Sequence, residues 1–218
     1  MSEEIDLELP DALRLNPNEA RILGVLVEKQ ATTPDTYPLT VNSLMSGCNQ
    51  KTNREPVMHL ESGEIGHALR QMSERSLVRQ VYGARVERWE HLLDDAYQLT
   101  SRKRGLIAVL LLRGPQTLNE LLMRCERIAA FPGLEHVKDE LDRLIEREPP
   151  LAIDLGRAAG QREDRYMHLL CGPVDPAEYA RSAAADHQSR PSGGLSARIE
   201  ALEHAVAELQ ARLAQLEP

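Results

Sequence analysis

The chain has 218 residues, of which 42% are hydrophobic, 28% are charged and 3% are aromatic, and its formal net charge is −8. Such a composition predicts that most of the chain folds, as one large domain or two small ones. The acidic balance argues against a generic basic nucleic-acid binder. The scarcity of aromatic rings argues against single-strand binding, which depends on stacking bases on such rings.

Neither a membrane span nor a secretion signal is expected. No stretch approaches the roughly 20 apolar residues that span a bilayer. The segment MSEEIDLELPD is acidic and lacks the basic and apolar regions of a signal peptide. The three cysteines, Cys48, Cys125 and Cys171, are an odd and widely spaced set that suits a reducing compartment. We therefore expect a cytoplasmic protein without membrane contact.

After an acidic arm at residues 1–15, the pattern predicts three helices and a hairpin. Asn16 and Pro17 are typical of a helix start. A short second helix follows the cap Thr40, and a third begins at Ser62. The inward positions of these helices are Ile22, Leu23, Leu26, Val27, Val41, Leu44, Met45, Ile65, Leu69 and Met72. Two strands at 77–82 and 85–89 are expected around the turn Gly83-Ala84.

A second unit repeats this order. Helices are expected at 101–113 and 117–125, and a third carries Leu134, Val137, Leu141, Leu144 and Ile145. Strands are expected at 151–155 and 166–170. The short helices TVNSLMSGCN and TLNELLMRCE align, so that Cys48 corresponds to Cys125. Buried core packing is the simpler interpretation of these two thiols, and a redox or metal-binding role is the alternative.

Three helices followed by a two-stranded hairpin are the element order of a winged helix. The predicted fold class is therefore mainly α with small β-hairpins. It comprises tandem winged-helix domains at 16–98 and 99–171, a linker at 172–194 and a C-terminal coiled-coil helix at 195–218.

The last segment carries a heptad pattern. Its core positions are Leu195, Ile199, Leu202, Val206, Leu209, Leu213 and Leu216. β-Branched residues at one core position and leucine at the other favour a parallel two-stranded coil, and hence a homodimer. The alternative is a single amphipathic helix that lies back on its own domain, because three heptads are short for an isolated coil.

Enzymatic chemistry is not expected. The seven histidines are scattered, and none has a partner at metal-ligand spacing. The sequence also lacks a phosphate-binding loop and a nucleophile elbow. We predict no catalytic residues, no metal site and no cofactor.

The first unit has features of a duplex-DNA reader. Residues 49–104 contain ten lysines and arginines against eight acidic residues, whereas the third helix of the second unit is acidic. A winged helix places its third helix in the major groove, where Arg70 could pair with guanine and Gln71 with adenine. Arginines on the hairpin would contact phosphates.

The loop CNQKTNREPVMHLESGE, between the second and third helices, is unusually long and polar. Asn49 and Asn53 are expected to close local turns, while Lys51 and Arg54 are the better contact candidates. The full set of candidate DNA contacts is Lys51, Arg54, His67, Arg70, Gln71, Arg79, Arg85 and Arg88.

Two functions remain open at this point. The first is a non-enzymatic dimeric regulator of transcription that binds double-stranded DNA. The second is an interaction scaffold whose winged helices dock on a protein partner, which the overall acidity favours.

The residues NPNEARILGVLVEKQATTPDTYPLTVNSLMSGCNQKTNREPV and LRGPQTLNELLMRCERI closely resemble the YceH family of bacterial cytosolic proteins. The resemblance covers about residues 14–172, and NQKTNREPV is its most specific part. It implies a tandem winged-helix fold and a bacterial cytosolic location. It supplies no catalytic residue and no ligand, and it does not reach the heptads.

Overall fold

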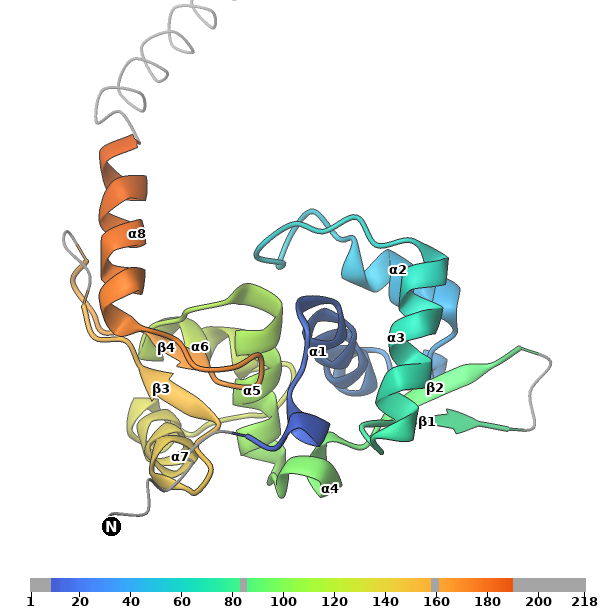
Figure 1. Ribbon diagram of the computed structural model, residues 1–218. Coiled ribbons are helices and arrows are strands. Elements are labelled where there is room, and N and C mark those ends of the chain that lie inside the picture. The colour runs from blue at the N-terminus through green and yellow to red at the C-terminus, as the bar shows by residue number, and fades with distance from the viewer. Residues whose placement is uncertain (1–8, 83–85, 158–160, 190–218) are drawn as a thin grey trace, which may run out of the picture. The chain divides into compact units, whose positions relative to one another are not determined.

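The computed structural model describes residues 9–82, 86–157 and 161–189 (Figure 1). Within these ranges, residues up to Pro176 form one compact unit, and most of the last helix belongs to a second unit. The described chain is mainly helical with two small antiparallel hairpins, as the sequence predicts. Among the residues that the structure describes, no helix is both long and apolar enough to cross a membrane.

The first half of the compact unit contains three helices, a hairpin and a short fourth helix. In chain order these are α1 (Pro17–Thr32), α2 (Val41–Cys48), α3 (Ser62–Glu74), β1 (Val78–Val81), β2 (Arg88–His91) and α4 (Leu93–Tyr97). Short 3-10 turns at Asp11–Leu13 and Pro34–Thr36 precede α1 and α2.

The second half repeats three helices and a hairpin. Its elements are α5 (Ser101–Arg113), α6 (Leu118–Cys125), α7 (Leu134–Glu146), β3 (Ala152–Asp154) and β4 (Tyr166–His168). The predicted order of elements is confirmed in both halves.

Side-chain caps determine where the helices begin. The Oδ1 atom of Asn16 accepts a hydrogen bond from the Glu19 amide at 3.0 Å. Thr40 and Thr117 cap the two equivalent short helices, each accepting from the amide three residues later at 3.2 Å. The predicted caps at Asn16 and Thr40 are therefore confirmed, and each satisfies an amide that has no partner within its helix.

The hydrophobic core runs through both halves. Most predicted inward residues of the two third helices, including Leu69 and Leu141, are fully buried, but Leu134 at the start of α7 is 36% exposed and Ile145 is only partly buried. At the centre, α1 packs against α5. A Cβ atom on Gly24 would lie only 2.8 Å from Leu112 Cγ, so the close approach of these two helices requires glycine.

In each half, the second strand of the hairpin forms a β-bridge with a residue just before the short second helix. In the first half, Leu39 and Trp89 exchange backbone hydrogen bonds of 3.0 and 2.8 Å. In the second half, Gln116 and Tyr166 do the same at 3.0 and 2.8 Å. These bridges were not predicted, because a single extended residue has no periodicity to detect.

Three sequence expectations are corrected. The second strand spans Arg88–His91 rather than 85–89, because Val78 pairs with His91 and Val81 with Arg88. The helix α4 was missed, although Leu93 and Tyr97 are buried at helical spacing. The linker expected at 172–194 is helical at Pro176–Ser189, where a first-turn proline precedes an alanine-rich run of good helix formers.

The other predictions for the C-terminal segment, including the heptad at 195–216, concern residues outside the described ranges.

Each hairpin has an aromatic residue in its second strand and a buried histidine two positions later. Trp89 and Tyr166 occupy the bridging positions, and they are followed by His91 and His168. Burial lowers the pKa of both histidines to about 4. The contacts of His91 agree with a neutral ring, because Nδ1 lies 3.3 Å from the Leu93 amide, which donates to it, and Nε2 lies 2.8 Å from Gln30 Oε1.

These two histidines predict a loss of stability in mild acid. In the unfolded chain their pKa returns to about 6.5, so the unfolded state binds more protons as the pH falls. The two histidines make their full contribution to the free energy of unfolding above about pH 6.5. That contribution is lost as the pH falls towards 4, by up to about 3 kcal/mol for each histidine. Urea unfolding at several pH values measures this slope.

Replacing His91 with Gln should flatten the pH dependence between 6.5 and 4. His136→Gln, at an exposed position on α7, is the control and should leave the slope unchanged. Equal slopes in all three proteins would contradict the assignment.

Candidate nucleic-acid interface

Helix α3 is held firmly against α1. Its inner residues Ile65, Leu69 and Met72 have no exposed surface. At its C-terminal end, Arg75 donates to the Arg14 carbonyl at 2.7 Å and forms an ion pair with the buried carboxylate of Glu19. The outer face of α3 is therefore presented in a fixed orientation.

That outer face carries His67, Arg70, Gln71 and Glu74, all exposed as expected. Arg70 extends back along the helix, where its Nη1 atom would lie 3.6 Å from a Cβ on Gly66. Among the arginines of the first half that the structure describes, Arg70 is the one whose guanidinium makes no hydrogen bond or ion pair. Its guanidinium is therefore held by no other residue that the structure describes.

The long loop between α2 and α3 is closed by Asn49. Its Nδ2 atom donates to the Leu60 carbonyl at 2.8 Å, and its Oδ1 atom accepts from the Leu60 amide at 2.8 Å. The structural role predicted for Asn49 is confirmed. Asn53 takes the left-handed conformation with φ of 62°, which asparagine tolerates better than most residues.

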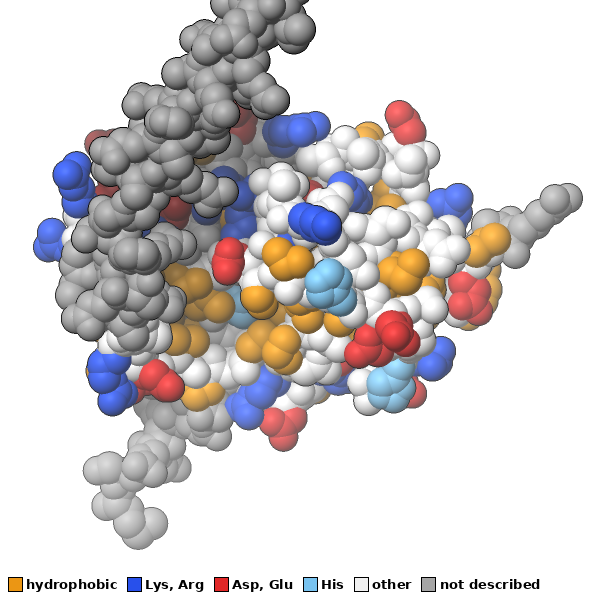
Figure 2. Space-filling view, turned by 90° about the horizontal axis from the view of Figure 1, so that it is seen from above, with side chains coloured by type: hydrophobic (Ala, Val, Ile, Leu, Met, Phe, Trp, Pro, Cys, Tyr) orange, Lys and Arg blue, Asp and Glu red, His pale blue; other side chains and the backbone are white. Residues whose placement is uncertain are grey.

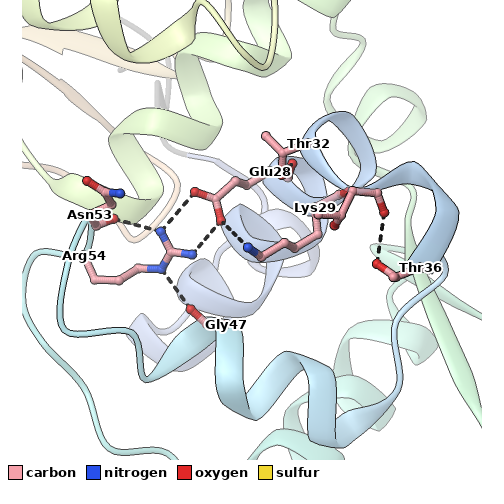
Figure 3. Close-up of polar contacts among 8 residues, drawn as sticks. Glu28, Lys29, Thr32, Thr36, Gly47, Asn53 and Arg54 are labelled. Atoms are coloured by element: carbon pink, nitrogen blue, oxygen red, sulfur yellow. Dashed lines mark hydrogen bonds and ion pairs between the residues drawn. The ribbon is translucent and has the colours of Figure 1, made fainter.

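Arg54 is buried beneath this loop, and the expectation that it presents its guanidinium at the surface is wrong. Its Nη2 and Nη1 atoms bond the two carboxylate oxygens of Glu28 at 2.6 and 3.1 Å, and its Nε atom donates to the Gly47 carbonyl at 2.9 Å (Figure 3). Every edge of the guanidinium is thus committed to the protein. Lys51 in the same loop is exposed, as predicted.

Of the three hairpin arginines, Arg79 and Arg88 are described by the structure, and they make different contacts. Arg88 donates to the carbonyls of Pro38 at 2.7 Å and Thr36 at 3.2 Å, so it mainly fastens the hairpin to the segment before α2. The side chain of Arg79 is 65% exposed and pairs with Glu90 through Nε at 2.7 Å. Arg85 lies outside the described residues.

The hairpin also exposes apolar residues that the sequence analysis did not single out. Tyr82 is 84% exposed and Val86 is 59% exposed, and they flank the undescribed tip. Figure 1 shows that β1 and β2 project away from the helices.

The equivalent helix of the second half has a different surface. On α7, Lys138 bonds Asp142 at 2.7 Å, and Arg143 bonds Glu140 at 3.3 Å. Both cations are therefore paired with carboxylates on their own helix. The remaining exposed charges there include Glu135, Asp139 and Glu146, so this face is acidic.

Cys48 and Cys125, which occupy equivalent positions in the two halves, are core residues, as predicted. Both have no exposed surface, and burial raises the pKa of each to about 12. A thiol that is buried and protonated is a poor nucleophile. The remaining cysteine, Cys171, is exposed.

Comparison with known proteins gives a consistent picture along the whole chain. A family described as "Protein of unknown function, DUF480" matches residues 15–161. A UPF0502 protein of Mesorhizobium japonicum is 51% identical over 213 residues, covering 98% of each chain. A UPF0502 protein of Stenotrophomonas maltophilia is 50% identical over 96% of this chain and 97% of its own.

A UPF0502 protein of Pseudomonas fluorescens is 49% identical and covers all of both chains. The similarity therefore extends through the C-terminal heptads, beyond the reach of the resemblance seen in the sequence.

The buried position of Arg54 generates a stability prediction. Arg54→Ala should lower the free energy of unfolding by about 2–4 kcal/mol, because Glu28 loses its partner and the Gly47 carbonyl loses a donor. Arg54→Lys should restore only part of this, since an ammonium cannot reproduce the two-pronged contact. Urea unfolding measures both changes.

Lys51→Ala is the matched control in the same loop. Its effect should stay within about 0.5 kcal/mol, as for most exposed positions. A loss in Arg54→Ala no larger than that of the control would contradict the structural role.

Proposed function

The chain belongs to the DUF480/UPF0502 family of bacterial proteins, and we propose that it is a non-enzymatic, cytoplasmic, tandem winged-helix protein that binds duplex DNA as a dimer. We assign the contact with DNA to the first half. The observation that carries this proposal is the state of Arg70, which is exposed and uncommitted on a helix that is otherwise rigidly fixed.

Helix α3 has the properties of a recognition helix. Its neighbouring side chains Arg70 and Gln71 are both exposed, and they are the residue types that pair with guanine and adenine edges in the major groove. The ion pair of Arg75 with Glu19 ties the C-terminal end of this helix to α1. A fixed helix pays little ordering entropy on binding.

The hairpin and the α2–α3 loop supply phosphate contacts. Arg79 is largely exposed, and its pair with Glu90 is a surface ion pair of small net energy. It can therefore exchange its carboxylate partner for a phosphate at low cost. Lys51 offers a second exposed cation, and Arg85 remains a candidate.

The second half has another task in this proposal. Its acidic α7 surface would be repelled by phosphates, and its cations are already paired. We therefore assign α5–α7 to support of the first half, through the packing of α1 against α5.

A protein-interaction scaffold is the second candidate. The specific observation that favours it is the acidic face of α7, because such a surface complements a basic protein partner. The two candidates differ in which face of the molecule is needed, so charge reversal on α3 and on α7 separates them.

Charge reversal at Arg70 tests the DNA proposal. Arg70→Glu should weaken binding to a mixed-sequence duplex at least roughly tenfold, because it removes one contact and adds repulsion. Fluorescence anisotropy at several salt concentrations measures the affinity, and wild-type binding should fall steeply with salt.

The control is Arg143→Glu on α7, which makes the same change of charge at another exposed arginine. It should leave DNA affinity nearly unchanged. If both variants lose affinity equally, the effect is one of net charge alone. If the wild-type protein does not bind even at low salt, the scaffold function takes precedence.

The heptads predict a dimer. Lysines at Leu202 and Leu209 should convert the full-length chain to a monomer, because charges would lie in the core of the coil. Lysines at His204 and Ala211, on the opposite side of the same heptad, should leave the dimer intact. Light scattering gives the mass, and a wild-type monomer would refute the proposed coil.

A further inference from the structure

A partly open pocket of about 390 Å³ lies within the compact unit, between the two halves. It is bounded by the start of α1, the loop before α3, the end of α5 and strand β4. Its apolar walls include Ala20, Pro56, Met58, Leu111, Pro115 and Met167. In Figure 2, hydrophobic side chains gather in the middle of the face seen from above. The volume is within the usual range of small-molecule sites, about 300–1,000 Å³.

A buried arginine lines this pocket and forms no ion pair among the described residues, although the exposed Glu55 also lines the pocket. Arg21 is only 2% exposed, and it donates to the carbonyls of Cys48 at 3.1 Å and Pro56 at 2.7 Å. Both acceptors are neutral, and the Nε atom is buried without a partner among the described residues. Burial, and then the neighbouring cation of Arg54, lowers the pKa of Arg21, while the nearby carboxylate of Glu55 acts in the opposite direction with a smaller effect. A positive charge in this position is costly until an anion approaches it.

A second buried polar group lines the same pocket. His168 is 4% exposed, and its Nδ1 atom is buried without a hydrogen-bond partner among the described residues. Buried polar atoms in folded proteins nearly always have partners, so an unpartnered nitrogen at a pocket wall indicates a place for a ligand group. The ring is neutral near pH 7, so it can donate one hydrogen bond without adding a second charge.

We propose that this pocket binds a small apolar carboxylate, with the hydrocarbon part against Met58, Leu111 and Met167 and the carboxylate directed towards Arg21 and His168. The apolar walls select a hydrocarbon body. The buried guanidinium, whose hydrogen bonds go to neutral carbonyls, selects an anionic head, and the histidine supplies a further donor. This ligand is a small molecule, so the inference does not depend on whether α3 binds DNA.

Octanoate is a suitable probe, with 1-octanol as its uncharged counterpart. Isothermal titration calorimetry on the full chain should show one octanoate per chain. Octanol should bind at least roughly tenfold more weakly, since it lacks the anionic head. Equal affinity for the two would refute the role of Arg21, and no binding of octanoate at millimolar concentration would refute the site.

Two tryptophan variants in one loop locate the site. Met58→Trp should fill the pocket and abolish octanoate binding. Val57→Trp is the matched control, because Val57 is 47% exposed and does not line the pocket. Unchanged binding by a folded Met58→Trp protein would overturn the proposal.

His168→Phe tests the polar end without filling the pocket. It keeps an aromatic ring in place but removes both nitrogens. Octanoate affinity should fall about tenfold while octanol affinity stays nearly constant. Retention of full octanoate affinity in His168→Phe would show that the head group does not reach this wall, and would refute the proposed orientation.

Discussion

Helix α1 is the element on which the rest of the structure depends. Its apolar residues pack against α2, α3 and α5, and Gly24 allows α5 to approach closely. The same helix carries three buried or half-buried charged residues that point to different parts of the chain. Glu19 holds α3 through Arg75, Arg21 holds the α2–α3 loop, and Glu28 holds Arg54. One helix thus positions α3, the α2–α3 loop and one wall of the pocket.

These buried charges specify position more than they add stability. Desolvation cancels much of the Coulomb energy of a buried ion pair, but the loss of one partner is expensive. Arg54 illustrates this, because its guanidinium joins Glu28 of α1 to the Gly47 carbonyl near the end of α2. The backbone amide of the next residue, Glu55, donates a hydrogen bond to the Leu112 carbonyl at 2.8 Å. The polar loop is therefore tied to both halves of the molecule, which is not what its hydrophilic composition suggests.

Sequence patterns predicted the local features, such as helix faces and caps, and missed the contacts between residues that are distant in the chain. Helical spacing placed Ile65, Leu69 and Met72 inside, and capping chemistry placed Asn16 and Thr40 at helix starts. The partner of Arg54 lies 26 residues away, and the bridge from Leu39 reaches Trp89. No local pattern records such pairs. The buried histidines left a trace, since aligning the hairpins sets WEH over YMH, but their burial followed only from the packing.

The two halves show how one framework can carry different surfaces. Both keep a threonine cap, a buried cysteine and a buried histidine at equivalent positions, and all of these face inward or close a helix end. The outer faces of α3 and α7 share no such constraint. On α7, Lys138 and Arg143 are each matched by a carboxylate one turn away, whereas Arg70 on α3 pairs with no carboxylate of the described residues. Core packing accounts for the shared inner residues, whereas it places no constraint on the charges of the outer faces of α3 and α7, which differ.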